Sequence, residues 1–87
     1  FFYDLSLIDG LKIYDSKANF ALAKLEYESN SIDFVSDALI NSGVYFRSCD
    51  DKFGLGKNFI RIASRTKEEN QKILMCIQKY GDEKWRR

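Results

Sequence analysis

Apolar and polar positions alternate in four stretches of the chain, which is the period-two pattern of β-strands. The pattern predicts strands over residues 11–14, 18–26, 44–48 and 58–64. In the second stretch Ala21, Ala23 and Leu25 share one face, because successive side chains of a strand point to opposite sides. Two alanines on one face leave room for a helix to pack closely there.

A helical period marks residues 32–42, where Ile32, Val35 and Leu39 fall on one stripe. The polar run before it, residues 28–31, is predicted to be a loop that ends in a candidate helix cap. Gly43 follows the last periodic residue and is suited to the left-handed conformation that ends many helices. We therefore expect one helix here with that stripe turned toward the core.

The second helix is predicted to start at a capping box that begins with Thr66. In that motif the Thr66 hydroxyl accepts from the Glu69 amide, and the Glu69 side chain accepts from the Thr66 amide. Gly81 is the expected end of this helix. Its apolar stripe is Ile73, Ile77 and Tyr80.

The element order β-β-α-β-β-α predicts an α+β two-layer sandwich, a small and mainly antiparallel sheet with two helices packed on one face. We expect residues 1–87 to form a single domain. The chain opens on Phe1 rather than Met, and residues 1–9 resemble the last turns of a helix. We therefore predict a domain of a larger protein, with 1–9 ending a linking helix and 82–87 forming a frayed tail.

The composition excludes several function classes. The net charge of +1 is far from that of a general nucleic-acid binder, and no apolar run approaches a membrane span. There is no histidine, which removes the commonest general base and metal ligand, so we expect neither a metal site nor triad chemistry. Cys49 and Cys76 are read as thiols in a reducing, cytoplasmic setting.

Two arginines stand among apolar strand residues, Arg47 and Arg61. A buried arginine needs an anionic partner, because an unpaired buried charge is costly. One interpretation is structural, with the arginines paired to Asp50 or Asp51. The other is an anion site, in which two planar guanidinium groups grip a carboxylate or phosphate. Arg65 is expected to be a surface residue beside the helix cap.

The segment GVYFRSCDDKFGLGKNFIRIASRTKEEN, together with GLKIYDSKANFALAKL upstream, resembles the C-terminal small domain of class I/II, fold-type-I pyridoxal-phosphate aminotransferases. The likeness is to the histidinol-phosphate aminotransferase and threonine-phosphate decarboxylase subgroup. It covers nearly the whole chain in matching order. Ser48 departs from the Asp common after the first motif arginine.

The resemblance implies three substrate-binding residues, Arg61, Arg47 and Asn19. Arg61 would grip the acidic group of an amino-acid-like substrate, Arg47 would be a second anion contact, and Asn19 would stand near the domain junction. A strand-start Asn19 satisfied by backbone is the structural alternative. The resemblance also implies pyridoxal 5'-phosphate, held by a large domain of the same polypeptide that also carries the catalytic residues. The partners implied are that domain, a small anionic substrate and a second subunit of a homodimer, with no nucleic acid or membrane.

The function expected is thus substrate binding and closure in a cytoplasmic aminotransferase, or a related decarboxylase, of amino-acid biosynthesis. Residues 1–87 alone would be inactive, with no catalytic, cofactor-binding or metal residue among them. Two alternatives stay open: a free-standing α+β module that binds an anionic ligand or RNA, and a structural domain in which Arg47 and Arg61 are internal ties.

Overall fold

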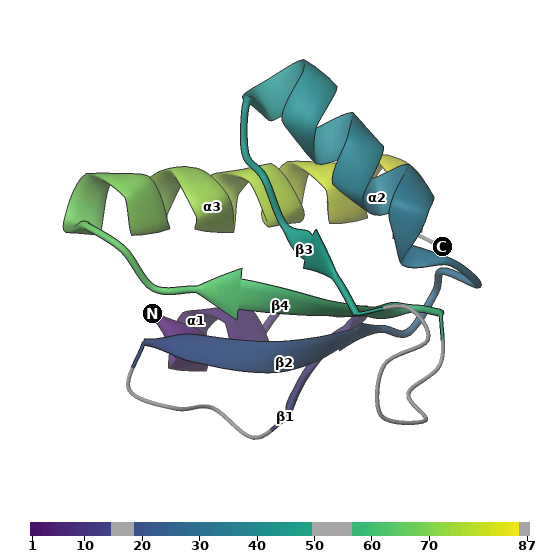
Figure 1. Cartoon of the computed structure of the whole chain (residues 1–87), viewed down its shortest axis with the longest axis horizontal. Coiled ribbons are helices and arrows are strands. Elements are labelled where there is room, and N and C mark those ends of the chain that lie inside the picture. Colours follow the sequence, from purple (N-terminus) through teal and green to yellow (C-terminus); the bar gives the residue numbers. More distant parts are fainter. Residues whose placement is uncertain (15–18, 50–56, 86–87) are drawn as a thin grey trace.

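The computed structural model describes residues 1–14, 19–49 and 57–85, and in them a four-stranded sheet is covered on one face by helices (Figure 1). The strands are β1 (Leu11–Tyr14), β2 (Phe20–Leu25), β3 (Arg47–Ser48) and β4 (Phe59–Ala63). They lie in the order β1-β2-β4-β3, and every neighbouring pair is antiparallel. This arrangement confirms the predicted α+β sandwich.

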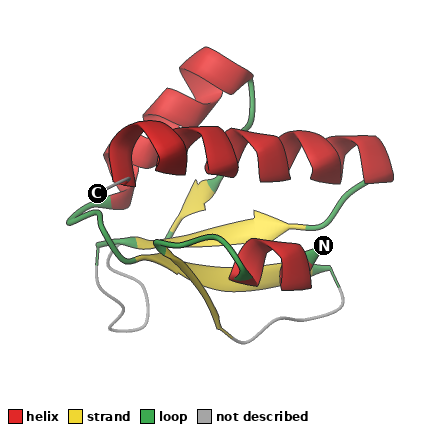
Figure 2. Cartoon of the chain, turned by 180° about the vertical axis from the view of Figure 1, so that it is seen from behind, coloured by secondary structure: helices red, strands yellow, loops and turns green. Residues whose placement is uncertain are grey.

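Two long helical segments form the second layer, seen from behind in Figure 2. The first is α2 (Ser31–Asp37), which continues into a π-helical turn, η1 (Ala38–Ser42). The second is α3 (Lys67–Tyr80), which continues into another π-helical turn, η2 (Gly81–Trp85). A short helix, α1 (Phe2–Ser6), packs against β1.

The core lies between the sheet and these helices. Ala21, Ala23 and Leu25 of β2 are buried on the helix side, as the alternation predicted. On β4 the buried residues are Ile60 and Ile62. Since strand side chains alternate, the residues between them point to the face that no described helix covers. Arg61 belongs to that open face.

The predicted third strand, residues 44–48, is too long. Only Arg47–Ser48 pairs with β4, while the Val44 amide donates to the Ala38 carbonyl oxygen at 3.2 Å. Val44 and Phe46 are nevertheless buried and Tyr45 is exposed. Residues 44–46 therefore alternate like a strand but have no strand partner, because the chain descends from the end of η1 before it reaches the sheet (Figure 1).

The predicted helix at 32–42 is present, but its predicted stripe is only partly right: Val35 is partly buried and packs against the core, while the other two residues are exposed. Ile32 is 51% exposed and Leu39 is 50% exposed, whereas Ser31, Phe34 and Ala38 face the core. The start is capped by Asn30, whose side chain accepts from the Ile32 amide at 2.8 Å. Gly43 is left-handed with φ +66°, as predicted.

The last helix begins as predicted at Thr66, whose hydroxyl oxygen accepts from the Glu69 amide at 3.2 Å. The reciprocal contact differs, because the Glu69 carboxylate accepts from the Thr66 hydroxyl at 3.1 Å instead of from its amide. Ile73, Ile77 and Tyr80 are buried, which confirms the stripe.

The end of that helix differs from the prediction. Gly81 has φ −62° and the chain stays helical to Trp85, so Gly81 does not end it. Trp85 is buried, and its indole Nε1 donates to Glu28 Oε2 at 2.9 Å. Residues 82–85 of the predicted frayed tail are therefore ordered by a buried aromatic side chain, and residues 86–87 lie outside the described part.

Candidate functional site

Arg47 and Arg61 are brought together by the pairing of β3 with β4. Their Cα atoms are direct partners in the register of the two strands, so both side chains stand on the same face of the sheet. The sequence separates them by a whole loop and could not show this register. The two arginines singled out from the sequence thus form a pair in space.

The pair lines a hollow of about 370 Å³, which we call the arginine hollow. A third arginine, Arg65, lines it too, from the turn between β4 and α3. The sequence placed Arg65 on the surface beside the cap, and it is indeed exposed, but its place at this hollow was missed. The other lining residues in the described part of the chain are Tyr45, Phe46, Ala63 and Ile73.

All three arginines of the hollow are exposed, which corrects the expectation of buried strand arginines. The Arg61 guanidinium carbon stands 5.2 Å from the centroid of the Phe20 ring, within reach of a cation–π contact. Within the described residues no carboxylate forms an ion pair with Arg47 or Arg61. The structural alternative named Asp50 and Asp51, and these lie outside the described residues.

The hollow is lined by three arginines, and none of its lining residues in the described part of the chain is acidic. Arg47 and Arg61 are directly opposite each other, and like charges in such a position destabilise a strand pair. An anion between them would remove that repulsion and accept several charge-assisted hydrogen bonds. The arrangement therefore suits the binding of a carboxylate or a phosphate group.

Asn19 lies at the start of β2, where its carbonyl oxygen accepts from the Ser64 amide at 2.7 Å. Asn19 is exposed, and the next residue, Phe20, pairs with Ala63 of β4. Asn19 is thus at the end of the sheet from which the chain leaves toward Arg65. It is not a lining residue of the arginine hollow.

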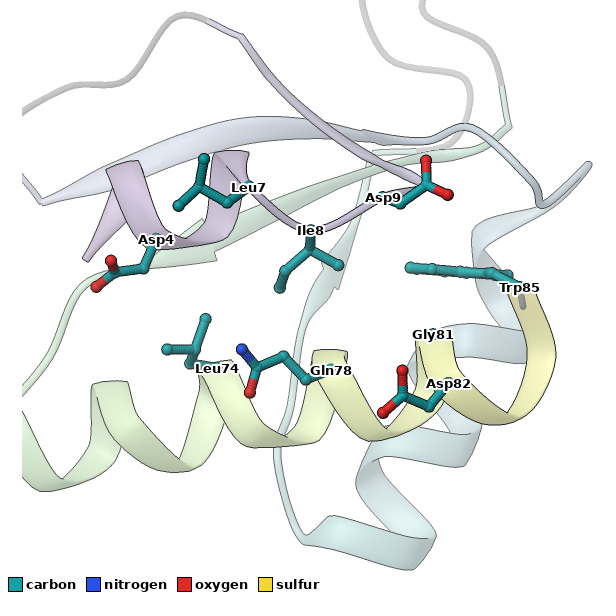
Figure 3. Close-up of a pocket in the computed structure, with 9 residues that line it drawn as sticks. All are labelled: Asp4, Leu7, Ile8, Asp9, Leu74, Gln78, Gly81, Asp82 and Trp85. Carbon is teal, nitrogen blue, oxygen red and sulfur yellow. The ribbon is translucent and has the colours of Figure 1, made fainter. Parts of the chain in front are cut away.

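A larger hollow, of about 680 Å³, lies between α1 and α3 and has the opposite charge (Figure 3). Asp4, Asp9 and Asp82 are its charged lining residues. Leu7, Ile8, Leu74 and Trp85 supply apolar surface. Carboxylates repel an anionic substrate, so the smaller arginine hollow is the better candidate for an anion in spite of its size.

No cluster of three metal-ligating side chains occurs in the parts of the chain that the structure describes, and no helix there could cross a bilayer. Cys49 and Cys76 are free and buried, and burial is the main cause that raises the pKa of the Cys76 thiol. A raised thiol pKa disfavours the reactive thiolate.

Pyridoxal phosphate is attached through a lysine whose pKa is lowered, usually by burial. Every lysine in residues 1–14, 19–49 and 57–85 is exposed or half-buried. The described residues therefore do not fit the attachment site of this cofactor.

Fold and hollow define a class of protein: a small two-layer α+β domain that presents neighbouring arginines on the open side of its sheet. No family model matches the chain. The chain is 54% identical over 77 residues to an L-serine phosphate decarboxylase of Campylobacter jejuni. The matched region covers 88% of this chain and 20% of the decarboxylase. The chain is 40% identical to a histidinol-phosphate aminotransferase of Clostridium novyi, over 86% of this chain and 19% of the relative.

Comparison with solved structures gives the same relationship. A decarboxylase from Sulfurospirillum multivorans superposes with a TM-score of 0.81 at 36% identity, over 88% of this chain and 22% of the other. The chain thus spans about a fifth of the length of these three proteins. It belongs to the fold-type-I pyridoxal-phosphate family and corresponds to the small C-terminal domain of the histidinol-phosphate aminotransferase and threonine-phosphate decarboxylase branch.

Proposed function

We propose that these residues are the substrate-binding and closure domain of a larger pyridoxal-phosphate enzyme, an aminotransferase or a decarboxylase. Its substrate would be an amino acid or a phosphorylated amino compound. The observation that supports this most is the pairing of Arg47 with Arg61 at one hollow, in a chain related to enzymes of that class. The proposal includes a homodimeric, cytoplasmic enzyme of amino-acid biosynthesis, on the resemblance alone.

In this proposal the cofactor is held by a large domain outside these residues and supplies an electron sink when bound. The present chain contributes position and exclusion of water. Arg61 binds the acidic group of the substrate through its planar guanidinium, and Arg47 opposite it is the second anion contact. Closure of the domain over the site would remove water and strengthen both contacts. Asn19 is proposed to stand near the domain junction.

Two other functions have less support. A free-standing module that binds RNA would need a basic surface, and the net charge is only +1. A purely structural role for the arginines would need anionic partners, and none pairs with them in the described part of the chain. The relationship to the two enzyme classes also favours the substrate-binding role.

The test is the substitution Arg61→Lys in the full-length polypeptide loaded with pyridoxal phosphate. Lysine keeps the charge but loses the bidentate geometry, so KM should rise about 10- to 100-fold with kcat nearly unchanged, equivalent to a loss of roughly 1.5–3 kcal/mol. Steady-state kinetics with a panel of amino acids and their phosphorylated analogues measures both constants.

The matched control is Lys12→Gln, which removes an exposed cation from β1, outside the hollow. It should leave kcat/KM within about twofold of the parent. An unchanged kcat/KM in Arg61→Lys would refute the assignment of Arg61. Binding of RNA by the parent protein, without turnover of any amino acid, would favour the module.

A further inference from the structure

We propose that Arg65 is a specificity-determining residue of the arginine hollow and makes it prefer a doubly charged phosphate group to a carboxylate. This inference rests on the proposed function, because it takes the hollow to be the site of the substrate's acidic group. It adds a residue that neither the strand pattern nor the motif arginines indicated. From the sequence alone, Arg65 was predicted only to be a surface residue.

The main chain on both sides of Arg65 is held in place. Its amide donates to Asn70 Oδ1 at 2.7 Å, and the Asn70 side-chain amide donates to Ser64 Oγ at 3.1 Å. The next residue, Thr66, is the cap of α3 and is bonded to the Glu69 amide at 3.2 Å. The base of the Arg65 side chain is therefore fixed beside the hollow, and only the side chain itself must be ordered when an anion binds.

The Arg65 guanidinium is free to take a ligand. The residue is exposed, and within the described residues its guanidinium makes no hydrogen bond or ion pair with a neighbour. The acidic residues nearest in sequence are Glu68 and Glu69, in the first turn of α3. Glu69 is turned onto the Thr66 hydroxyl at 3.1 Å. Neither glutamate lines the hollow.

Charge explains why a third arginine changes the preference. A carboxylate carries one negative charge and two oxygen atoms, and the guanidinium groups of the paired Arg47 and Arg61 would be enough to satisfy both oxygens. A phosphomonoester carries about −1.5 to −2 charges near pH 7 and three strong acceptor oxygens. The additional charge and oxygen atom of a phosphate would give the Arg65 guanidinium a partner. Arg65 would add little to the binding of a carboxylate, which has neither.

The experiment compares two anions on the full-length protein loaded with pyridoxal phosphate. Inorganic phosphate and acetate are titrated by calorimetry at one ionic strength, with Arg65→Gln, Arg65→Lys and the control Lys67→Gln. Lys67 is an exposed cation two residues along that does not line the hollow, so its variant reports the general loss of charge.

We expect Arg65→Gln to weaken phosphate binding about tenfold, the effect of losing one charge-assisted hydrogen bond, and to change acetate binding less than about threefold. Arg65→Lys should recover part of the phosphate affinity. Equal weakening of both anions, or an effect of Arg65→Gln no greater than that of Lys67→Gln, overturns the inference about Arg65.

A variant at Arg61 separates this failure from failure of the proposed function. If Arg61→Lys weakens anion binding and Arg65→Gln does not, the substrate-anion site stands and only the role of Arg65 is lost. If the unsubstituted protein binds neither phosphate nor acetate, and Arg61→Lys has no effect on turnover, the proposed function and this inference fall together.

Discussion

Glu28 is the residue on which two buried aromatic side chains depend. Its Oε1 accepts from the Tyr80 hydroxyl at 3.1 Å, and its Oε2 accepts from the Trp85 indole at 2.9 Å. Tyr80 and Trp85 are both buried, and a buried polar atom without a partner is costly. One carboxylate therefore satisfies the polar atoms that come with burying both rings.

Tyr80 makes the stability of the protein sensitive to alkaline pH. Burial, and then the nearby Glu28 carboxylate, raise the pKa of Tyr80 above its ordinary value. Because an unfolded tyrosine titrates near about pH 10, the contribution of Tyr80 is fully present below about pH 10 and is lost as the pH rises toward the folded-state pKa. The free energy of unfolding should fall there by up to about 1.4 kcal/mol per pH unit on account of this residue.

Chemical denaturation between pH 7 and 11 measures this loss. Tyr80→Phe should reduce the alkaline fall and cost about 1–2 kcal/mol at neutral pH, since the hydrogen bond to Glu28 is removed. Tyr3→Phe is the matched control, because Tyr3 is 74% exposed, and it should leave the alkaline fall intact. An alkaline fall that is unchanged in Tyr80→Phe would contradict the assignment.

At the scale of an element, α2 shows how two apolar stripes compete for one core. Ile32, Val35 and Leu39 follow a helical period, and so do Phe34 and Ala38. The structure buries the second set. Phe34 lies 5.2 Å from Phe46, 4.8 Å from Tyr80 and 5.9 Å from Trp85, measured between ring centroids. An aromatic cluster contributed by other elements decides which face of α2 is inside.

Stability measurements on two alanine variants distinguish the stripes. Phe34→Ala should lower the free energy of unfolding by about 3–5 kcal/mol, because it leaves a cavity among three other rings. Ile32→Ala, on the half-exposed stripe, should cost less than about 1 kcal/mol. Urea denaturation measures both. Costs in the reverse order would show that the stripe predicted from the sequence is the buried one.

At the scale of the whole molecule, the first strand and the last helical turn meet at Gly10. This residue has φ +98°, and a Cβ atom added to it would lie 2.8 Å from Trp85 and 2.8 Å from Tyr27. Tyr27 is itself tied to Asp9, whose carboxylate accepts from the Tyr27 hydroxyl at 2.9 Å. The two segments, far apart in the sequence, thus pack tightly against each other at Gly10, where there is no room for a side chain.

The tight packing at Gly10 is tested by comparing Gly10→Ala with Gly43→Ala. Both residues have positive φ, so each substitution should cost about 1–2 kcal/mol of backbone strain. At Gly43 the nearest atom to an added Cβ is Lys72 Nζ at 3.8 Å, so no clash is added. At Gly10 the clash with Trp85 and Tyr27 should add about 1–3 kcal/mol. Equal melting temperatures for the two variants would argue against the close packing.

Local features followed from the sequence because they depend on neighbours a few residues away. The strand Leu11–Tyr14, the buried alanine face of β2, the Thr66 cap and the left-handed Gly43 were all predicted and are all present. Arg47 and Arg61 were also singled out, since a cation among apolar strand residues stands out by its chemistry alone.

Tertiary structure decided whatever depends on contacts between distant segments. The register of β3 on β4 set Arg47 opposite Arg61, and the turn into α3 brought Arg65 to the same hollow. Packing against the aromatic cluster determines which face of α2 is buried. The hydrogen bond to Glu28 stabilises Trp85 in the core, at a position where the sequence predicted a frayed tail. Periodicity shows that a helix has an apolar face, but which face is buried is determined by the side chains that other elements place against it.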